Sequence, residues 1–156
     1  MVTNRGSRRA TEPVLKDKLS DKSREKVITK PEMMPLILEV CPSFESKWRA
    51  FLDYWGDESE PPLYLALSDL ARHLIDMLAR DDVATFPEVF AVVERWHIEG
   101  VPYVAEAASI GLLEDLQNTG LHTSTTPEQF RPYLLPESAK WWDRLNEFWE
   151  GRKPLS

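Results

Sequence analysis

The chain has 156 residues, of which 42% are hydrophobic, 10% aromatic and 29% charged, and its formal net charge at pH 7 is -7. This composition is enough for one packed core and excludes a wholly disordered chain. The single cysteine excludes an internal disulfide framework and a zinc site built on several thiolates. No apolar run approaches the roughly 20 residues of a membrane-spanning helix, so we expect a soluble, cytoplasmic protein that does not engage membranes.

Charge is divided unevenly along the chain. Residues 1–30 hold nine Lys and Arg against four Asp and Glu and contain no aromatic residue, whereas the remaining 126 residues hold ten against twenty-two. We therefore predict a disordered basic N-terminal tail over 1–30 and a single acidic helical domain over 31–152. The tail mixes both signs and lacks aromatic rings for base stacking, and the body is acidic, so we expect no nucleic-acid partner.

The first two predicted helices lie between proline and glycine boundaries. A helix over residues 32–40 is framed by Pro31 and Pro42. The next begins at Ser43, a favoured N-cap residue, and apolar side chains then recur at helical spacing as far as Trp55. Gly56 ends this helix before a stretch rich in acidic residues and proline.

Two longer amphipathic helices follow. From Leu63 to Leu78 the apolar residues recur every three or four positions and form one stripe. Thr85 and Glu88 have the spacing of a capping box, which predicts a further helix that ends at Gly100.

The C-terminal third of the chain predicts three more helices. Pro102 opens a helix over 102–118, and a second capping signature at Thr126 opens a short helix that stops before Pro132. The last helix begins at Pro136 and has an apolar face rich in tryptophan. These elements predict an all-α fold, a compact bundle of about six or seven helices that includes a HEAT-like helix pair.

The sequence lacks an assembled catalytic or metal-binding motif. Glu94 and His97 have the Glu-x-x-His spacing of di-iron bundles, but the second pair that such bundles need is missing. Glycine-rich phosphate loops and GxSxG elbows are also missing, and Cys41 before Pro42 is typical of a small buried side chain. We therefore predict a protein that is not an enzyme, with no catalytic residue, no cofactor and no metal.

The helix over 102–118 carries an unusual stripe of small side chains. Val104, Ala107, Ala108 and Gly111 share one narrow sector of a helical wheel; Asp115 and Asn118 continue this sector, and Glu114 borders it. One interpretation is tight helix packing inside the domain. The other is a shallow groove whose polar end receives part of another protein. An acidic side chain near a helix C-terminus is mildly unfavourable, which favours a basic partner for this end, either within the domain or on another protein.

The segments PLILEVCPSF, VVERWHIEG, YVAEAASIGLLEDLQN and KWWDRLNEFW resemble a family of small, acidic, all-helical bacterial proteins that are similar to the immunity proteins of polymorphic toxins. The resemblance covers roughly three-quarters of the chain and brings no catalytic motif with it. It implies an immunity or antitoxin-like protein that neutralises a cognate, basic toxin by direct protein–protein binding.

For such a role we expect an interface built from aromatic anchors with acidic neighbours and from the polar helix end. Its predicted residues are Trp55, Asp57, Glu58, Glu60, Glu94, Trp96, Glu99, Glu114, Asp115 and Asn118. Two alternatives stay open. In the first, the protein is a helical adaptor or regulatory subunit that forms a homodimer through the small-residue stripe. In the second, it is a small enzyme or ligand-binding bundle with a site that the sequence does not reveal.

Overall fold

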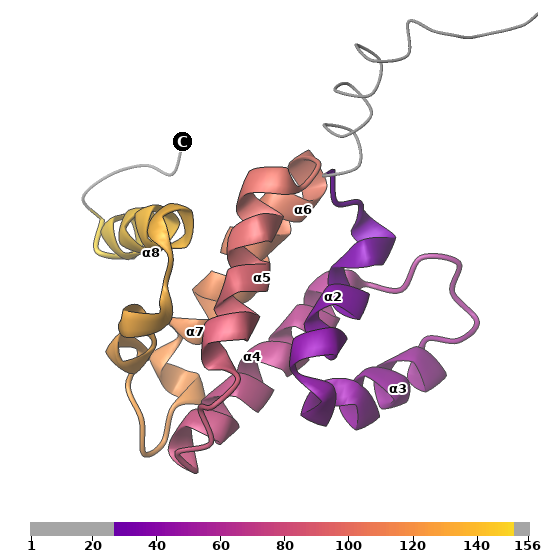
Figure 1. Ribbon diagram of the computed structural model, residues 1–156, viewed down its shortest axis with the longest axis horizontal. Helices are drawn as coiled ribbons and strands as arrows, with labels where there is room; N and C mark the ends of the chain where they lie inside the picture. Colours follow the sequence, from indigo (N-terminus) through magenta and orange to yellow (C-terminus); the bar gives the residue numbers. More distant parts are fainter. Residues whose placement is uncertain (1–26, 152–156) are drawn as a thin grey trace, which may run out of the picture.

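The computed structural model describes residues 27–151, and this part of the chain is an assembly of helices (Figure 1). In chain order these are η1 (Lys30–Glu32), α2 (Met33–Val40), η2 (Pro42–Phe44), α3 (Glu45–Tyr54), α4 (Leu63–Ala79), α5 (Phe86–Glu99), α6 (Pro102–Glu106), η3 (Ala107–Leu113), α7 (Glu114–Leu116), η4 (Thr119–Leu121), η5 (Pro127–Tyr133) and α8 (Pro136–Trp149). Segment η3 is a π-helix, and the other η segments are 3₁₀ turns. The all-α prediction is confirmed.

Helices α4 and α5 run through the middle of the molecule, with α2 and α3 on one side and α7 and α8 on the other (Figure 1). The apolar stripe of α4 is buried along its length, because residues three and four apart share one face of a helix. On α5, Phe86, Phe90 and Trp96 are fully buried. The core therefore lies where these two helices meet the α6–α7 region and α8.

The folded part of the chain begins earlier than the sequence predicts. Ile28 is only 3% exposed, and its backbone N–H donates to the Glu99 carbonyl at 2.8 Å. The backbone N–H of Val101 donates in turn to the Ile28 carbonyl at 3.0 Å. The predicted tail boundary at residue 30 is therefore wrong, because an apolar side chain and two backbone hydrogen bonds fix residues 27–30 on the domain. The rest of the predicted tail, residues 1–26, lies outside the described residues.

Only one of the three predicted N-caps is confirmed. Thr126 forms a capping box with Gln129, whose Oε1 accepts from the Thr126 N–H at 2.7 Å. Ser43 instead lies within the 3₁₀ turn that Pro42 opens, and α3 starts after it without a side-chain cap. Thr85 has helical backbone angles, so its hydroxyl does not cap α5 and is buried without a hydrogen bond. The short helix also continues through Pro132 rather than stopping before it.

The predicted helix over 102–118 is built from α6, the π-helical segment and α7. The small-residue stripe is buried along this helix, and Gly111 meets α4 so closely that an added Cβ would lie 2.8 Å from Leu67 Cδ1. Tight packing inside the domain is therefore the correct interpretation of the stripe, and it offers no face to a second copy of the chain. The HEAT-like pairing is seen only in part, because α6 packs on α5 whereas the π-helical segment packs mainly on α4.

Candidate functional site

The predicted interface residues fall in three separate places. Trp55, Asp57, Glu58 and Glu60 lie at the end of α3 and in the loop before α4; Glu94, Trp96 and Glu99 lie on α5; Glu114, Asp115 and Asn118 lie at the end of α7. The α3–α4 loop lies beyond α2 and α3 at one end of the long axis, whereas α7 lies on the other side of α4 and α5 (Figure 1). These residues therefore do not form one surface.

The α3–α4 loop is an exposed acidic segment. Asp57 and Glu58 are exposed, and Glu60 Oε1 lies 3.5 Å from the Nζ atom of Lys30. Trp55 is half-buried, whereas Tyr54, in edge contact with its ring, is 81% exposed. The aromatic side chain that reaches solvent here is thus Tyr54, which the apolar periodicity of the helix did not single out.

The predicted interface residues on α5 support the fold and are largely inaccessible to a partner protein. Trp96 is fully buried, so it is not accessible as the aromatic anchor that the predicted interface requires. Glu94 is also buried, and its carboxylate accepts hydrogen bonds from the backbone N–H groups of Glu137 and Ser138 at the start of α8. Glu99 lies at the helix end and pairs with Arg95 at 3.2 Å. The burial of Glu94 and Trp96 removes both from any surface that a partner protein touches.

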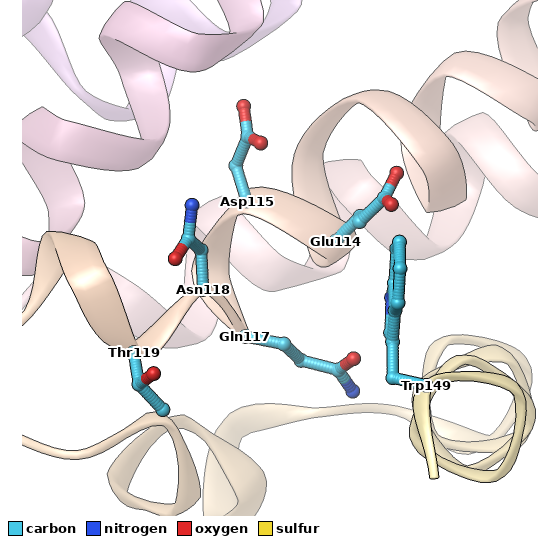
Figure 2. A pocket seen from close by; sticks show the side chains of 6 residues that line it. All are labelled: Glu114, Asp115, Gln117, Asn118, Thr119 and Trp149. Carbon is cyan, nitrogen blue, oxygen red and sulfur yellow. The ribbon is translucent and has the colours of Figure 1, made fainter. Parts of the chain in front are cut away.

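A pocket of about 490 Å³ lies between the end of α7 and the end of α8. Its lining consists of Glu114, Asp115, Gln117, Asn118, Thr119 and Trp149 (Figure 2). We call it the Glu114 pocket. It brings together the three predicted residues at the polar helix end and adds an indole ring from another helix.

Different contacts fix the side chains around this pocket. The Ser68 hydroxyl of α4 donates to Asp115, and Asn118 Oδ1 accepts from the backbone N–H of Gly120 at 2.9 Å. Gln117 reaches towards α8, where its Nε2 donates to the Trp142 carbonyl at 2.8 Å. Glu114 lies beside the Trp149 ring (Figure 2). The pocket wall is therefore held from α4, from η4 and from α8.

The pocket carries negative charge without a basic side chain to balance it. Burial raises the pKa of Glu114, and the neighbouring Asp115 carboxylate raises it further. Burial, followed by the charges of Glu106, Tyr103 and Glu114, raises the pKa of Tyr64 to about 12. Within residues 27–151, Lys, Arg and His side chains form no ion pair with Glu114 or Asp115. A cation bound beside the Glu114 carboxylate and the indole would relieve the repulsion between Glu114 and Asp115.

Residues 34–150 match a protein family described as a domain of unknown function, DUF7674. The chain belongs to this family. Comparison with curated proteins and with solved structures finds no match. The matched range contains the whole Glu114 pocket, so this site is part of the DUF7674 domain and not an appendage to it.

Sequence reasoning missed Trp149 as a site residue of the DUF7674 domain. The helical spacing assigned it to the buried face of α8, in line with Leu145 one turn earlier. Leu145 is 1% exposed, but Trp149 is 59% exposed and makes an edge contact with Phe148 at 5.1 Å. The last turn of α8 therefore extends past the core. Gly151, two residues after Trp149, is the signal in the sequence that the helix ends here.

Ser43 and His73 form the one serine–histidine pair of the described DUF7674 chain, with Oγ and Nε2 2.8 Å apart. On the other side of the ring, Lys47 Nζ lies 3.0 Å from Nδ1. An ammonium group can only donate, so Nδ1 accepts and Nε2 carries the imidazole proton. His73 therefore donates to Ser43 and is not poised to remove its proton, which is the reverse of a nucleophile–base pair.

Two further properties of residues 27–151 bear on function. His, Cys, Asp and Glu side chains do not gather here in groups of three or more that would ligate a metal ion. None of the helices in this range combines the length and the apolar character needed to cross a membrane.

Proposed function

We propose that the protein neutralises a cognate toxin by binding it directly, with a basic side chain of the toxin seated in the Glu114 pocket. The observation that carries this proposal is the adjacent pair of carboxylates, Glu114 and Asp115, beside an exposed indole and without a basic partner in the described chain. The resemblance of the sequence to immunity proteins supplies the class of partner.

The chemistry of the pocket suits an arginine side chain. A guanidinium group is planar and donates up to five hydrogen bonds, which the carboxylate of Glu114 and the amide oxygens nearby can accept. Its flat face can stack on the Trp149 ring. We therefore expect arginine to bind better than lysine at this position.

The overall charge supports the same partner. The chain has a net charge of -7, so a basic toxin would be drawn to it at long range and its association would slow as salt is added. Such binding covers a basic surface of the toxin, and basic surfaces are what nucleic-acid or nucleotide substrates need. Neutralisation then follows from occlusion and needs no chemistry by this protein.

The test begins with capture of the tagged, full-length protein from its native cells and identification of what co-elutes. Binding of that partner is then measured by calorimetry for the wild type, for Glu114→Gln/Asp115→Asn, and for Asp57→Asn/Glu58→Gln. Both double variants remove two charges with little change of shape. We expect the pocket variant to weaken binding at least tenfold and the loop variant to weaken it by less than threefold.

Either of two results would overturn the proposal. If the pocket variant binds the partner as tightly as the wild type, the Glu114 pocket is not the contact. If the protein is recovered alone, or only as its own dimer, the helical adaptor becomes the better explanation.

A further inference from the structure

Three side chains with soft or nitrogen donor atoms meet where α2 ends against α4. Cys41 Sγ lies 4.0 Å from Met77 Sδ. The Ser43 hydroxyl oxygen sits among them, 3.6 Å from Cys41 Sγ, 3.9 Å from Met77 Sδ and 2.8 Å from His73 Nε2. A thiol, a thioether and an imidazole therefore surround a single hydroxyl group.

The local fold places these groups together. Helix α2 ends at Val40, and the backbone N–H of the next residue, Cys41, still donates to the Ile37 carbonyl at 2.7 Å. Pro42 then turns the chain into the 3₁₀ segment. His73 and Met77 are four residues apart, so they share the face of α4 that meets this turn. The Cys-Pro-Ser turn after α2 and the His-x-x-x-Met pattern on α4 are thus brought together by the contact of this turn with α4.

The cluster is buried but lies directly under the surface. Cys41, His73 and Met77 are 1%, 5% and 3% exposed, while Ser43 and Lys47 above them are exposed. The Ser43 hydroxyl and the Lys47 ammonium group, which both contact the His73 ring, would have to move aside for an incoming ion. The three donors would then hold it away from water.

We propose that Cys41, His73 and Met77 form a binding site for Cu(I). Two sulfur ligands about 2.3 Å from one ion and about 120° apart are separated by about 4 Å, which matches the spacing of the two sulfur atoms here. Thiolate and thioether donors select Cu(I), and an imidazole nitrogen is a suitable third ligand. The thioether disfavours Zn²⁺, whose protein ligands are thiolate, imidazole and carboxylate.

Proton balance makes the site testable. Cys41 must lose its thiol proton to bind the ion, and the imidazole must move its proton from Nε2 to Nδ1. Lys47, which is exposed, then releases Nδ1 and turns to solvent. Binding of one Cu(I) therefore releases one proton overall and leaves the net charge of the protein unchanged. The site shares no residue with the Glu114 pocket, so it does not depend on the proposed function.

The experiment titrates the reduced, full-length protein with Cu(I) under anaerobic conditions in competition with bicinchoninate. We expect one Cu(I) per chain and an X-ray absorption spectrum with two sulfur ligands and one nitrogen ligand. Met77→Leu keeps the shape of the side chain and removes only the thioether, so it should weaken binding at least tenfold. The matched control is Met33→Leu, which replaces a fully buried methionine outside the cluster, on α2. This variant should bind Cu(I) with unchanged affinity.

We expect Cys41→Ala to lose the one-to-one binding of Cu(I). We also expect the wild type to release one proton for each Cu(I) that it binds. The proposal is overturned if Met77→Leu or Cys41→Ala binds as tightly as the wild type, because binding then does not use this cluster. It is also overturned if the wild type leaves all Cu(I) with the chelator. Thermal unfolding of each variant verifies that the domain is folded before its affinity is interpreted.

Discussion

Glu94 of α5 holds the N-terminus of α8 through the backbone of Ser138. Its Oε1 accepts from the Ser138 N–H at 2.9 Å, and its Oε2 accepts from the Glu137 N–H at 2.8 Å. Leu135, the residue before α8, has no side chain that can cap the helix. Glu94 therefore performs the role of an N-cap from 44 residues away, and its negative charge is also favourable at this end of the helix dipole.

Removal of this carboxylate should loosen α8. We expect Glu94→Ala to lower the free energy of unfolding by about 2–3 kcal/mol, because two buried N–H groups lose their acceptor. Glu94→Gln should cost less, since its amide oxygen can still accept one bond. Urea unfolding gives both values. Glu99→Ala, which breaks only a partly exposed ion pair with Arg95, is the control and should cost less than about 1 kcal/mol. Equal losses in Glu94→Ala and Glu99→Ala would contradict the capping role.

Glu94 also illustrates what local sequence patterns reveal. Trp96 lies on the apolar face of α5, and helical periodicity can detect such a face because its residues are three and four apart. The burial of Glu94 depends on α8, which is distant in sequence, and periodicity carries no information on that contact. A single charged residue on a helix therefore resembled a surface group until the tertiary packing was known.

Gly111 should be intolerant of any side chain. A Cβ there would lie 2.8 Å from Leu67 Cδ1 in the fully buried contact between the π-helical segment and α4. We expect Gly111→Leu to cost at least about 1–3 kcal/mol through overpacking, and Gly111→Ala to cost less. The melting temperature of each variant measures the loss. Gly56→Ala, where the nearest atom would be 3.4 Å away, is the control. An unchanged melting temperature in Gly111→Leu would show that α4 yields at this contact.

The α7 half of the candidate site was predictable, and the α8 half was not. The small-residue stripe and the polar residues that follow it identified Glu114, Asp115 and Asn118 as one helix end. The π-helical turn within that helix was not predicted, since Gly111 was assigned to the small-residue stripe of a regular helix. Trp149 joins the pocket only because α8 crosses the end of α7, which is a tertiary relationship.

Substitution of the buried Trp142 and of the exposed Trp149, both on α8, should change the stability of the domain by different amounts. Trp142 is fully buried, so Trp142→Ala should lower the free energy of unfolding by about 3–5 kcal/mol. Trp149 is 59% exposed, and Trp149→Ala should change stability by less than about 1 kcal/mol while removing the indole wall of the Glu114 pocket. Urea unfolding separates the two. A large loss in Trp149→Ala would mean that this ring supports the fold and is not free to receive a ligand.

His97 should make the domain less stable in acid. Both ring nitrogens of His97 are buried without a hydrogen-bond partner in the described chain. Burial lowers the pKa of His97 to about 4, although the charges of Glu94 and Glu137 act to raise it. In the unfolded chain the pKa of a histidine is about 6.5. Between pH 6.5 and pH 4 the unfolded state therefore binds a proton that the folded state does not. The resulting stability is complete above pH 6.5 and is lost as the pH falls to 4.

We expect this loss to reach about 3 kcal/mol for His97, from a pKa difference of two to three units. Replacement by phenylalanine keeps an aromatic ring in the same space and removes the titration. Urea unfolding of the wild type and of His97→Phe at pH 7.5 and pH 4.5 gives four free energies, and the wild type should lose more on acidification than the variant. Burial also lowers the pKa of His73, but His73 is present in both proteins and cancels from the comparison. Equal acid losses in the two proteins would mean that His97 finds a solvent path or a proton acceptor when it is charged.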